Sequence, residues 1–267
     1  MQFIQNNFNY LSCNLDTICK KIIFHNKIDS KFKLTCVSGY WIIKNKHNNS
    51  FINWFEKSLR INCPYVFFGN KESINLIKKY RRELPTYYIE MNIEDFVTYK
   101  YKYKNNMITH NVHCPSIELN LIWNEKIFMI KKALEINPFS SDFFAWVDSG
   151  ICVYRNKSPP KIPFPNISKL NNLPKNKFIY SSSSNSFNET KFQKGKYHLH
   201  HHICGTSYIL HKDIINQFVM LYSKYLKLID KNDIWTDQVI LTLIYQEYPE
   251  LFHKYSDGYG TIVVNMY

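Results

Sequence analysis

An aspartate follows an uninterrupted apolar run near the middle of the chain. The run Phe143–Val147 has no polar break, as expected of a strand buried on both faces, and it ends abruptly in Asp148-Ser149-Gly150. In open parallel sheets, ligands bind at the carboxyl ends of the strands. A carboxylate there can hold a divalent metal that bridges diphosphate oxygens, and Gly150 would let the ligand approach the backbone. The alternative is a turn aspartate after a core strand, because Asp-Ser-Gly alone is not a specific motif.

A second candidate lies nearer the C-terminus, at Asp237 and Gln238. Thr236 is a good helix N-cap, so both side chains would lie in the first helical turn and could face a cleft. There they could contact a sugar or assist a proton transfer. The alternative is structural, since the helix dipole favours an aspartate at a helix N-terminus.

Histidines recur between residues 198 and 202. On a strand, His198, His200 and His202 would share one face, which suits zinc or another metal. The chain has no H-E-x-x-H motif, so the favoured interpretation is that one or two of these side chains line a cleft and the others are solvated.

Basic residues form a fourth group of candidates. The chain has 30 Lys and only 4 Arg, and the pair Arg81-Arg82 follows two lysines on a predicted helix. Because arginine has a forked geometry that lysine lacks, this pair could reach a diphosphate. Lys126 could contact a phosphate as well. The two arginines could instead lie at a solvated helix end, since a helix C-terminus favours cations, and Lys126 could be a plain surface charge.

The composition narrows the class of protein. The 267 residues are 45% hydrophobic and 21% charged, which excludes a disordered or fibrous chain. No apolar run approaches the roughly 18–20 residues of a membrane span, and the first residues do not resemble a signal peptide. The seven cysteines are scattered without a C-x-x-C pair, which favours a reducing compartment. We therefore expect a soluble, cytoplasmic protein.

The net charge of +13 invites a nucleic-acid interpretation. Nucleic-acid surfaces usually depend on arginine, however, and this chain has little of it. The abundant residues Lys, Asn, Ile and Tyr share AT-rich codons, so genome composition explains part of the lysine excess. Nucleic acid is therefore not the expected partner.

Short apolar runs alternate with amphipathic stretches, which predicts an α/β protein with a mainly parallel sheet flanked by helices. Residues 155–176 hold five prolines and predict an extended loop before an appended C-terminal half. The chain lacks a Walker A loop, G-x-G-x-x-G and G-x-S-x-G. Strands are expected at 34–43, 64–68, 86–91, 143–147, 178–180, 204–210 and 261–264, and helices at 51–59, 73–84, 121–136, 213–229 and 237–248.

Six short segments together resemble one known family in their order and spacing. They are Cys36–Trp41, Cys63–Phe68, Trp123–Lys126, Asn137–Phe139, Trp146–Gly150 and Asp237-Gln238. The family is HtrL/YibB, whose members look like glycosyltransferases of the GT-A type. The resemblance implies a single GT-A-like (Rossmann-like) domain over 1–267, with a nucleotide-sugar-binding half at 34–150 and an acceptor or catalytic half at 177–267.

The resemblance also implies the ligands. The donor would be a nucleotide sugar, with a UDP-sugar as the first expectation, and the acceptor a glycan or glycoprotein. Mn²⁺ or Mg²⁺ would bind at Asp148 with His253 as a further ligand, and Asp237 or Gln238 would lie near the reacting sugar. The donor-binding residues would be Ser38, Gly39, Tyr40, Arg81, Arg82, Lys126, Ser149 and Gly150. The chemistry expected is electrostatic stabilisation of the leaving nucleoside diphosphate.

One position departs from the family's metal motif. Gly150 stands where a second acid is expected, and a single carboxylate binds a divalent ion more weakly. The diphosphate and His253 would then have to supply the other ligands, or the dependence on metal is lost.

Two other classes of protein compete with the transferase. One is a non-catalytic basic binding or virion protein that uses its lysine surface on nucleic acid or an acidic partner. The other is a metal-dependent hydrolase built on the histidines at 198–202. The AT-rich composition also suits a giant DNA virus, for which the host cytoplasm or a viral factory would be the location.

Overall fold

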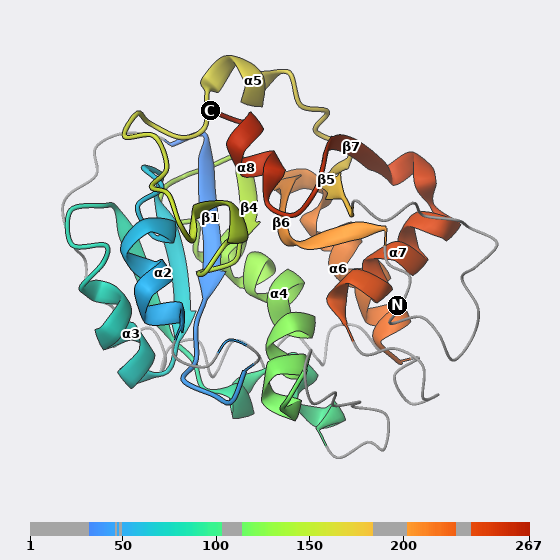
Figure 1. Cartoon of the computed structure of the whole chain (residues 1–267). Helices are drawn as coiled ribbons and strands as arrows, with labels where there is room; N and C mark the ends of the chain where they lie inside the picture. The colour runs from blue at the N-terminus through green and yellow to red at the C-terminus, as the bar shows by residue number, and fades with distance from the viewer. Residues whose placement is uncertain (1–31, 46, 48–49, 103–113, 184–201, 228–235) are drawn as a thin grey trace.

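One sheet of seven strands runs through the part of the chain that the computed structural model describes, which is residues 32–45, 47, 50–102, 114–183, 202–227 and 236–267 (Figure 1). The strand order is β3-β2-β1-β4-β6-β5-β7. The strands are β1 (Leu34–Gly39), β2 (Tyr65–Gly69), β3 (Thr86–Glu90), β4 (Phe143–Val147), β5 (Phe178–Ser182), β6 (Ile203–His211) and β7 (Phe252–Asp257). Strands β1 to β4 are parallel, β6 is antiparallel to β4 and β5, and β7 is parallel to β5.

Helices cover both faces of this sheet. The α-helices are α2 (Ser50–Ser58), α3 (Lys71–Lys78), α4 (Ile117–Ile136), α5 (Ile167–Asn171), α6 (Lys212–Leu226), α7 (Asp237–Glu247) and α8 (Thr261–Asn265), and the 3-10 helices are η3 (Ile93–Asp95), η4 (Val97–Tyr101), η5 (Cys152–Tyr154) and η9 (Pro249–Leu251). One buried cluster joins α4, α6 and α7 to one face, and another joins α2, α3 and α8 to the other. The predicted α/β fold with a mainly parallel sheet is confirmed. None of the described helices has the length and apolarity of a membrane span.

The unbroken apolar run forms strand β4, whose side chains are buried on both faces of the sheet. Phe144 and Trp146 belong to the cluster on the α4 side, whereas Phe143, Ala145 and Val147 belong to the cluster on the α2 side. Successive side chains of a strand point to opposite faces, so a strand covered on both sides needs apolar residues at every position. The sequence therefore predicts both the bounds and the burial of β4.

The C-terminal end differs from the sequence prediction. Residues 261–264 were expected to form a strand, but they lie in helix α8, which Gly260 introduces with a left-handed φ of +74°. Ile262 and Val263 pack on the sheet from one helical turn, because burial there outweighs the strand preference of β-branched residues. The last strand is β7, an edge strand in which only Phe252 is buried, so it lacks the apolar pattern of a core strand.

Helix α4 carries polar side chains into the interior. The Ser116 side chain accepts from a backbone N–H of the first turn and caps the helix. Asn124, Glu125 and Lys126 are buried on it, and buried polar groups need partners. Asn124 Oδ1 accepts from the Tyr222 hydroxyl of α6 at 2.9 Å. The partners of Lys126 define the site described next.

Candidate functional site

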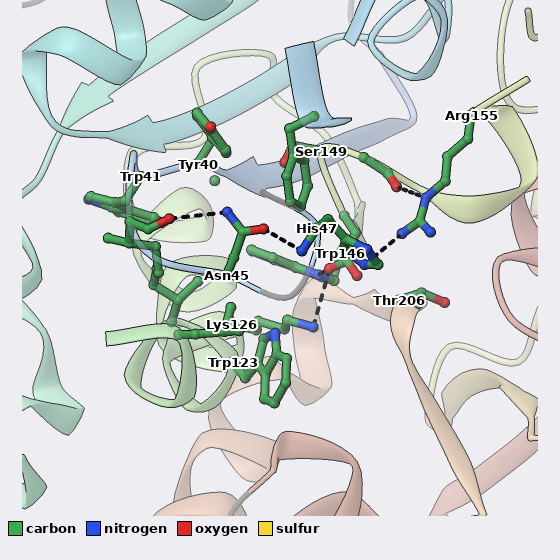
Figure 2. Close-up of a pocket in the computed structure, with 17 residues that line it drawn as sticks. Tyr40, Trp41, Asn45, His47, Trp123, Lys126, Trp146, Ser149, Arg155 and Thr206 are labelled. Carbon is green, nitrogen blue, oxygen red and sulfur yellow. Dashed lines mark hydrogen bonds and ion pairs between the residues drawn. The ribbon is translucent and has the colours of Figure 1, made fainter. Parts of the chain in front are cut away.

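A pocket lies at the carboxyl ends of β1 and β4, beside α4 (Figure 2). Its volume of about 160 Å³ is below the roughly 300–1,000 Å³ typical of whole small-molecule sites, so it would hold one part of a larger ligand. The position is where open α/β sheets bind ligands. The lining residues are Gly39, Tyr40, Trp41, Ile43, Asn45, His47, Phe51, Leu119, Ile122, Trp123, Lys126, Trp146, Asp148, Ser149, Gly150, Arg155 and Thr206.

The Lys126 ammonium is the buried centre of the site. Its Nζ lies 3.2 Å from Asp148 Oδ1 and 3.0 Å from Asp237 Oδ2, and it donates to the Gly205 carbonyl at 2.7 Å. The side chain is 5% exposed and lies 5.4 Å from the centre of the Trp146 ring. Burial by itself would lower the pKa of Lys126, but the two carboxylates raise that pKa overall. The lysine therefore stays positively charged inside the protein.

Asp237 and Gln238 approach this lysine from the C-terminal half. Thr236 caps α7 through its side chain, which places Asp237 in the first turn, as predicted. Asp237 is 3% exposed; burial raises its pKa and Lys126 opposes the rise. Gln238 Oε1 accepts from the Gly205 N–H at 3.0 Å, and so it holds the backbone whose carbonyl binds Lys126. Asp237 therefore contacts Lys126 and Gln238 contacts its partner Gly205, but neither residue lines the pocket.

Asp148 lies at the end of β4 and lines the pocket. Its Oδ1 accepts from Trp146 Nε1 at 2.7 Å and pairs with Lys126, while its side chain stays 34% exposed. Its backbone N–H donates to the carbonyl of Thr206 at 2.9 Å, which fixes the strand end. Among the described residues, the buried Thr206 hydroxyl has no hydrogen-bond partner. Asp148 and Thr206 are therefore paired through their backbones, and both residues line the pocket.

Arg155 is a pocket cation that the sequence analysis did not single out. Its guanidinium lies 3.8 Å from the centre of the Trp54 ring, and Nε donates to the Gly150 carbonyl at 3.0 Å. One terminal nitrogen lies 3.5 Å from His47 Nε2. Figure 2 shows Arg155 and Lys126 reaching the pocket from separate parts of the chain. The available signal was the rarity of arginine, which was applied only to the other arginine pair.

Aromatic rings form the β1 side of the pocket. Tyr40 and His47 each approach Phe51, with ring centres 5.6 Å and 5.7 Å apart. Gly39 and Tyr40, predicted to hold the donor, line the pocket. Ser38 precedes them in β1 but is fully buried outside the lining, and its hydroxyl has no hydrogen-bond partner among the described residues.

Arg81 and Arg82, predicted to reach a diphosphate, do not lie in this pocket. Arg81 is 1% exposed, and its guanidinium donates to the carbonyls of Leu59 and Cys63 at 2.7 Å and 2.8 Å and to Thr86 Oγ1 at 2.8 Å. Its donors are satisfied by the protein itself, so Arg81 is a structural residue and the prediction of a donor contact is wrong. Arg82 is exposed on the turn that follows α3.

His253 does not meet Asp148. It is an exposed residue of β7, where it pairs in register with Ile179 of β5. Strands β5 and β6 lie between β7 and β4, so the two predicted metal ligands are on strands that are not neighbours. This separation could not be predicted, because no strand was expected at the residues of β7.

The donor set at Asp148 does not fit Mn²⁺ or Mg²⁺. These cations take several oxygen ligands, but the described residues contain no group of three His, Cys, Asp or Glu side chains that could hold an ion. Gly150 stands where the second acid was expected. The Lys126 ammonium already lies between Asp148 and Asp237, so a divalent cation bridging these carboxylates would meet its positive charge at close range.

His202 is the one member of the histidine run that falls within the described residues; His198 and His200 lie outside them. The His202 ring nitrogen Nε2 lies 2.9 Å from the Tyr180 hydroxyl, and the backbone N–H donates to Thr242 Oγ1 at 2.9 Å. The ring also packs against Tyr245, with centres 4.8 Å apart. These contacts place His202 in an aromatic cluster beside β5 and α7.

Solved structures share the fold. Core-mannan synthase A from Aspergillus fumigatus, in a Mn/GDP form, aligns with a TM-score of 0.50 and 11% identity over 86% of this chain and 74% of its own. A glycosyltransferase involved in glycosylation of the major capsid of PBCV-1 aligns at 0.43 and 13% identity, over 84% and 81% of the two chains. The 4-diphosphocytidyl-2C-methyl-D-erythritol synthase of Anaerococcus prevotii aligns at 0.41 and 11%, over 87% and 91%. The likeness to core-mannan synthase A, at a TM-score of 0.50, shows that the chain has a GT-A-like fold.

Sequence comparison points to one family. No curated protein matches the chain. The profile of HtrL_YibB, described as a bacterial protein of unknown function, matches residues 89–261. That range includes Lys126, Asp148, Arg155 and Asp237, whereas the aromatic side of the pocket precedes it. The chain, with more than half of its length matched, belongs to the HtrL/YibB family.

Proposed function

We propose that this protein is a glycosyltransferase that binds a nucleotide-sugar donor in the pocket at the ends of β1 and β4. The observation that carries the proposal is a pair of cations, Lys126 and Arg155, beside the Asp148 carboxylate at the ligand-binding edge of a GT-A-like sheet. The GDP named for the fungal synthase supports a nucleoside diphosphate as the ligand class. A UDP-sugar is the first donor to test, and a glycan or glycoprotein is the acceptor class.

The reaction needs stabilisation of a leaving group. When the bond between the anomeric carbon and the diphosphate breaks, negative charge develops on the nucleoside diphosphate, and the fixed positive charges of Lys126 and Arg155 would stabilise it. Asp148, which is partly exposed in the pocket, would accept hydrogen bonds from the sugar hydroxyls. The rings of Tyr40 and Phe51 offer apolar faces against which a nucleobase can stack.

Asp237 and Gln238 act as positioning residues in this proposal. Asp237 holds the Lys126 ammonium through its carboxylate, and Gln238 holds Gly205, whose carbonyl is the third partner of the lysine. They therefore fix the direction of the positive charge without contacting the donor. Pre-set charges of this kind need no reorganisation when the reaction occurs.

The test is a thermal-shift series with UDP, GDP, dTDP and CMP, followed by nucleotide-sugar hydrolysis. A ligand at 100 times its Kd adds about 2.7 kcal/mol of stability, which raises the Tm by several degrees. Arg155→Gln should abolish most of the shift, because its guanidinium faces the pocket. Arg82→Gln is the matched control, since Arg82 is exposed outside the pocket and should leave the shift unchanged.

Absence of a shift with every nucleotide, together with no release of nucleoside diphosphate from any nucleotide sugar, would contradict the proposal. The net charge of +13 would then favour the basic binding protein. In that case nucleic-acid affinity should fall steeply as salt increases, because binding releases counterions from the phosphates.

A further inference from the structure

Lys126 lies at the position where a metal ion would be expected to balance the acids of the site. We propose that its ammonium takes the place of a divalent cation, so that the donor diphosphate binds without metal. The inference rests on the proposed function. A divalent cation was expected at Asp148, but the Lys126 ammonium already pairs with Asp148 and Asp237, and the described residues contain no group that could hold a metal ion.

The three oxygens around Nζ come from three different elements. Asp148 follows β4, Gly205 lies in β6 and Asp237 begins α7, and their oxygens are 2.7–3.2 Å from the lysine nitrogen. Because the Lys126 side chain is only 5% exposed and its ammonium has three oxygen partners, this is a specific buried site and not an incidental surface contact. The protein itself therefore supplies a cation where the acids converge.

The charges of the pocket and of Asp237, the buried partner of Lys126, balance without an added ion. Asp148 and Asp237 contribute two negative charges, and Lys126 and Arg155 contribute two positive charges. A diphosphate entering the pocket thus meets a locally neutral site and not an acidic one that needs a metal first. Since the lysine is already occupied by oxygen partners, it provides charge, while Arg155, which lines the pocket, provides N–H donors to the phosphates.

The first experiment measures nucleoside diphosphate binding to the unaltered protein by calorimetry, with UDP and GDP, in EDTA and in Mn²⁺. The expected Kd differs by less than about twofold between the two conditions. Lys126→Met should weaken binding by about tenfold or more, because it removes a charged partner of the phosphates. Lys131→Met on the same helix, whose Nζ pairs with Glu135 at the surface, is the matched control and should leave the Kd unchanged.

Binding that requires Mn²⁺ and is lost in Asp148→Asn would overturn the inference. The comparison between EDTA and Mn²⁺ is made on the unaltered protein, so its result is valid even if a lysine variant does not fold. If neither UDP nor GDP binds with or without Mn²⁺, the proposed function fails, and the second experiment decides on the lysine by itself.

The second experiment uses the metal alone. Lys126→Ala leaves Asp148 and Asp237 unpaired and opens space between them, so this variant should gain a Mn²⁺ site that paramagnetic resonance detects. The unaltered protein and the double variant Lys126→Ala/Asp237→Asn should show no such site. Mn²⁺ binding to the unaltered protein with the same affinity as to Lys126→Ala, and its loss in Asp148→Asn, would show that the lysine does not replace the ion.

Discussion

Two buried cations lie on opposite sides of the sheet, and their partners differ in kind. Arg81 packs with the cluster under α2 and α3, where it donates to neutral backbone carbonyls and stacks 3.8 Å from the centre of the Tyr65 ring. Lys126 lies under α4, pairs with two carboxylates and lines a pocket. Arg81 binds the backbone of nearby segments, whereas Lys126 balances the charge of two carboxylates beside a pocket that a ligand can enter. The partners, and not the burial, separate the structural cation from the one that we propose acts on the ligand.

The largest expected effect is on the structural side. Arg81→Met leaves the carbonyls of Leu59 and Cys63 buried without donors, and each such group costs roughly 1–3 kcal/mol. We expect the free energy of unfolding to fall by about 3–5 kcal/mol in urea denaturation. Nucleotide-induced shifts measured on the folded fraction should be unchanged. An unchanged urea midpoint would show that Arg81 lacks the structural role that distinguishes it from Lys126.

A third buried charge sharpens the comparison through its pH dependence. Glu125 accepts from the backbone N–H of Val97 and from the N–H and hydroxyl of Thr98, and burial raises its pKa from 4.5 to about 7 despite these bonds. The folded state therefore binds a proton that the unfolded state has released between these pH values. Stability should decline as pH rises through that window, by on the order of 3 kcal/mol.

Urea denaturation at pH 4.5 and pH 7.5 measures this contribution. Glu125→Gln cannot titrate, so the part of the decline due to Glu125 should disappear in it. Identical pH profiles for the two proteins would show that this carboxyl does not hold the raised pKa.

The smallest effect concerns the backbone beside Lys126. A Cβ at Gly205 would stand 2.5 Å from Asp237 Oδ2, so Gly205→Ala must push the carboxylate away from the lysine. Overpacking of this kind costs roughly 1–3 kcal/mol. The matched test is Gly205→Ala combined with Asp237→Ala, which removes the carboxylate and leaves Gln238 Cγ, at 2.9 Å, as the remaining close atom. If urea denaturation shows that the two substitutions add without coupling, the contact is not the cause of the loss.

Local sequence signals predicted the parts of the site that depend on one element. The unbroken apolar run gives β4 and therefore the position of Asp148, and Thr236 gives the start of α7 and therefore the position of Asp237. The same reasoning could not pair these acids with Lys126, because the three residues come from separate elements and meet only through the packing of α4 and α7 on the sheet.

The rarity of arginine in this chain marked the arginines as candidates, but it could not show what each of them does. Arg81 and Arg155 have the same chemistry, and only the tertiary structure shows that one is enclosed by carbonyls and the other faces a pocket. His253 was expected at the metal site only through the family resemblance, and the exposed edge residues of β7 give no periodic signal that could correct this expectation.

The contacts of Lys126 also determine how this protein could be divided. The lysine and Asp148 precede the proline-rich stretch at 155–176, whereas Gly205 and Asp237 follow it. A fragment that ends before β5 keeps a cation and one acid, and the complementary fragment keeps an acid that lost its cation. Buried charges without partners are costly, so each fragment would be less stable alone than in the other's presence. We therefore expect that neither half would keep its stability if it were transplanted into another protein without the other.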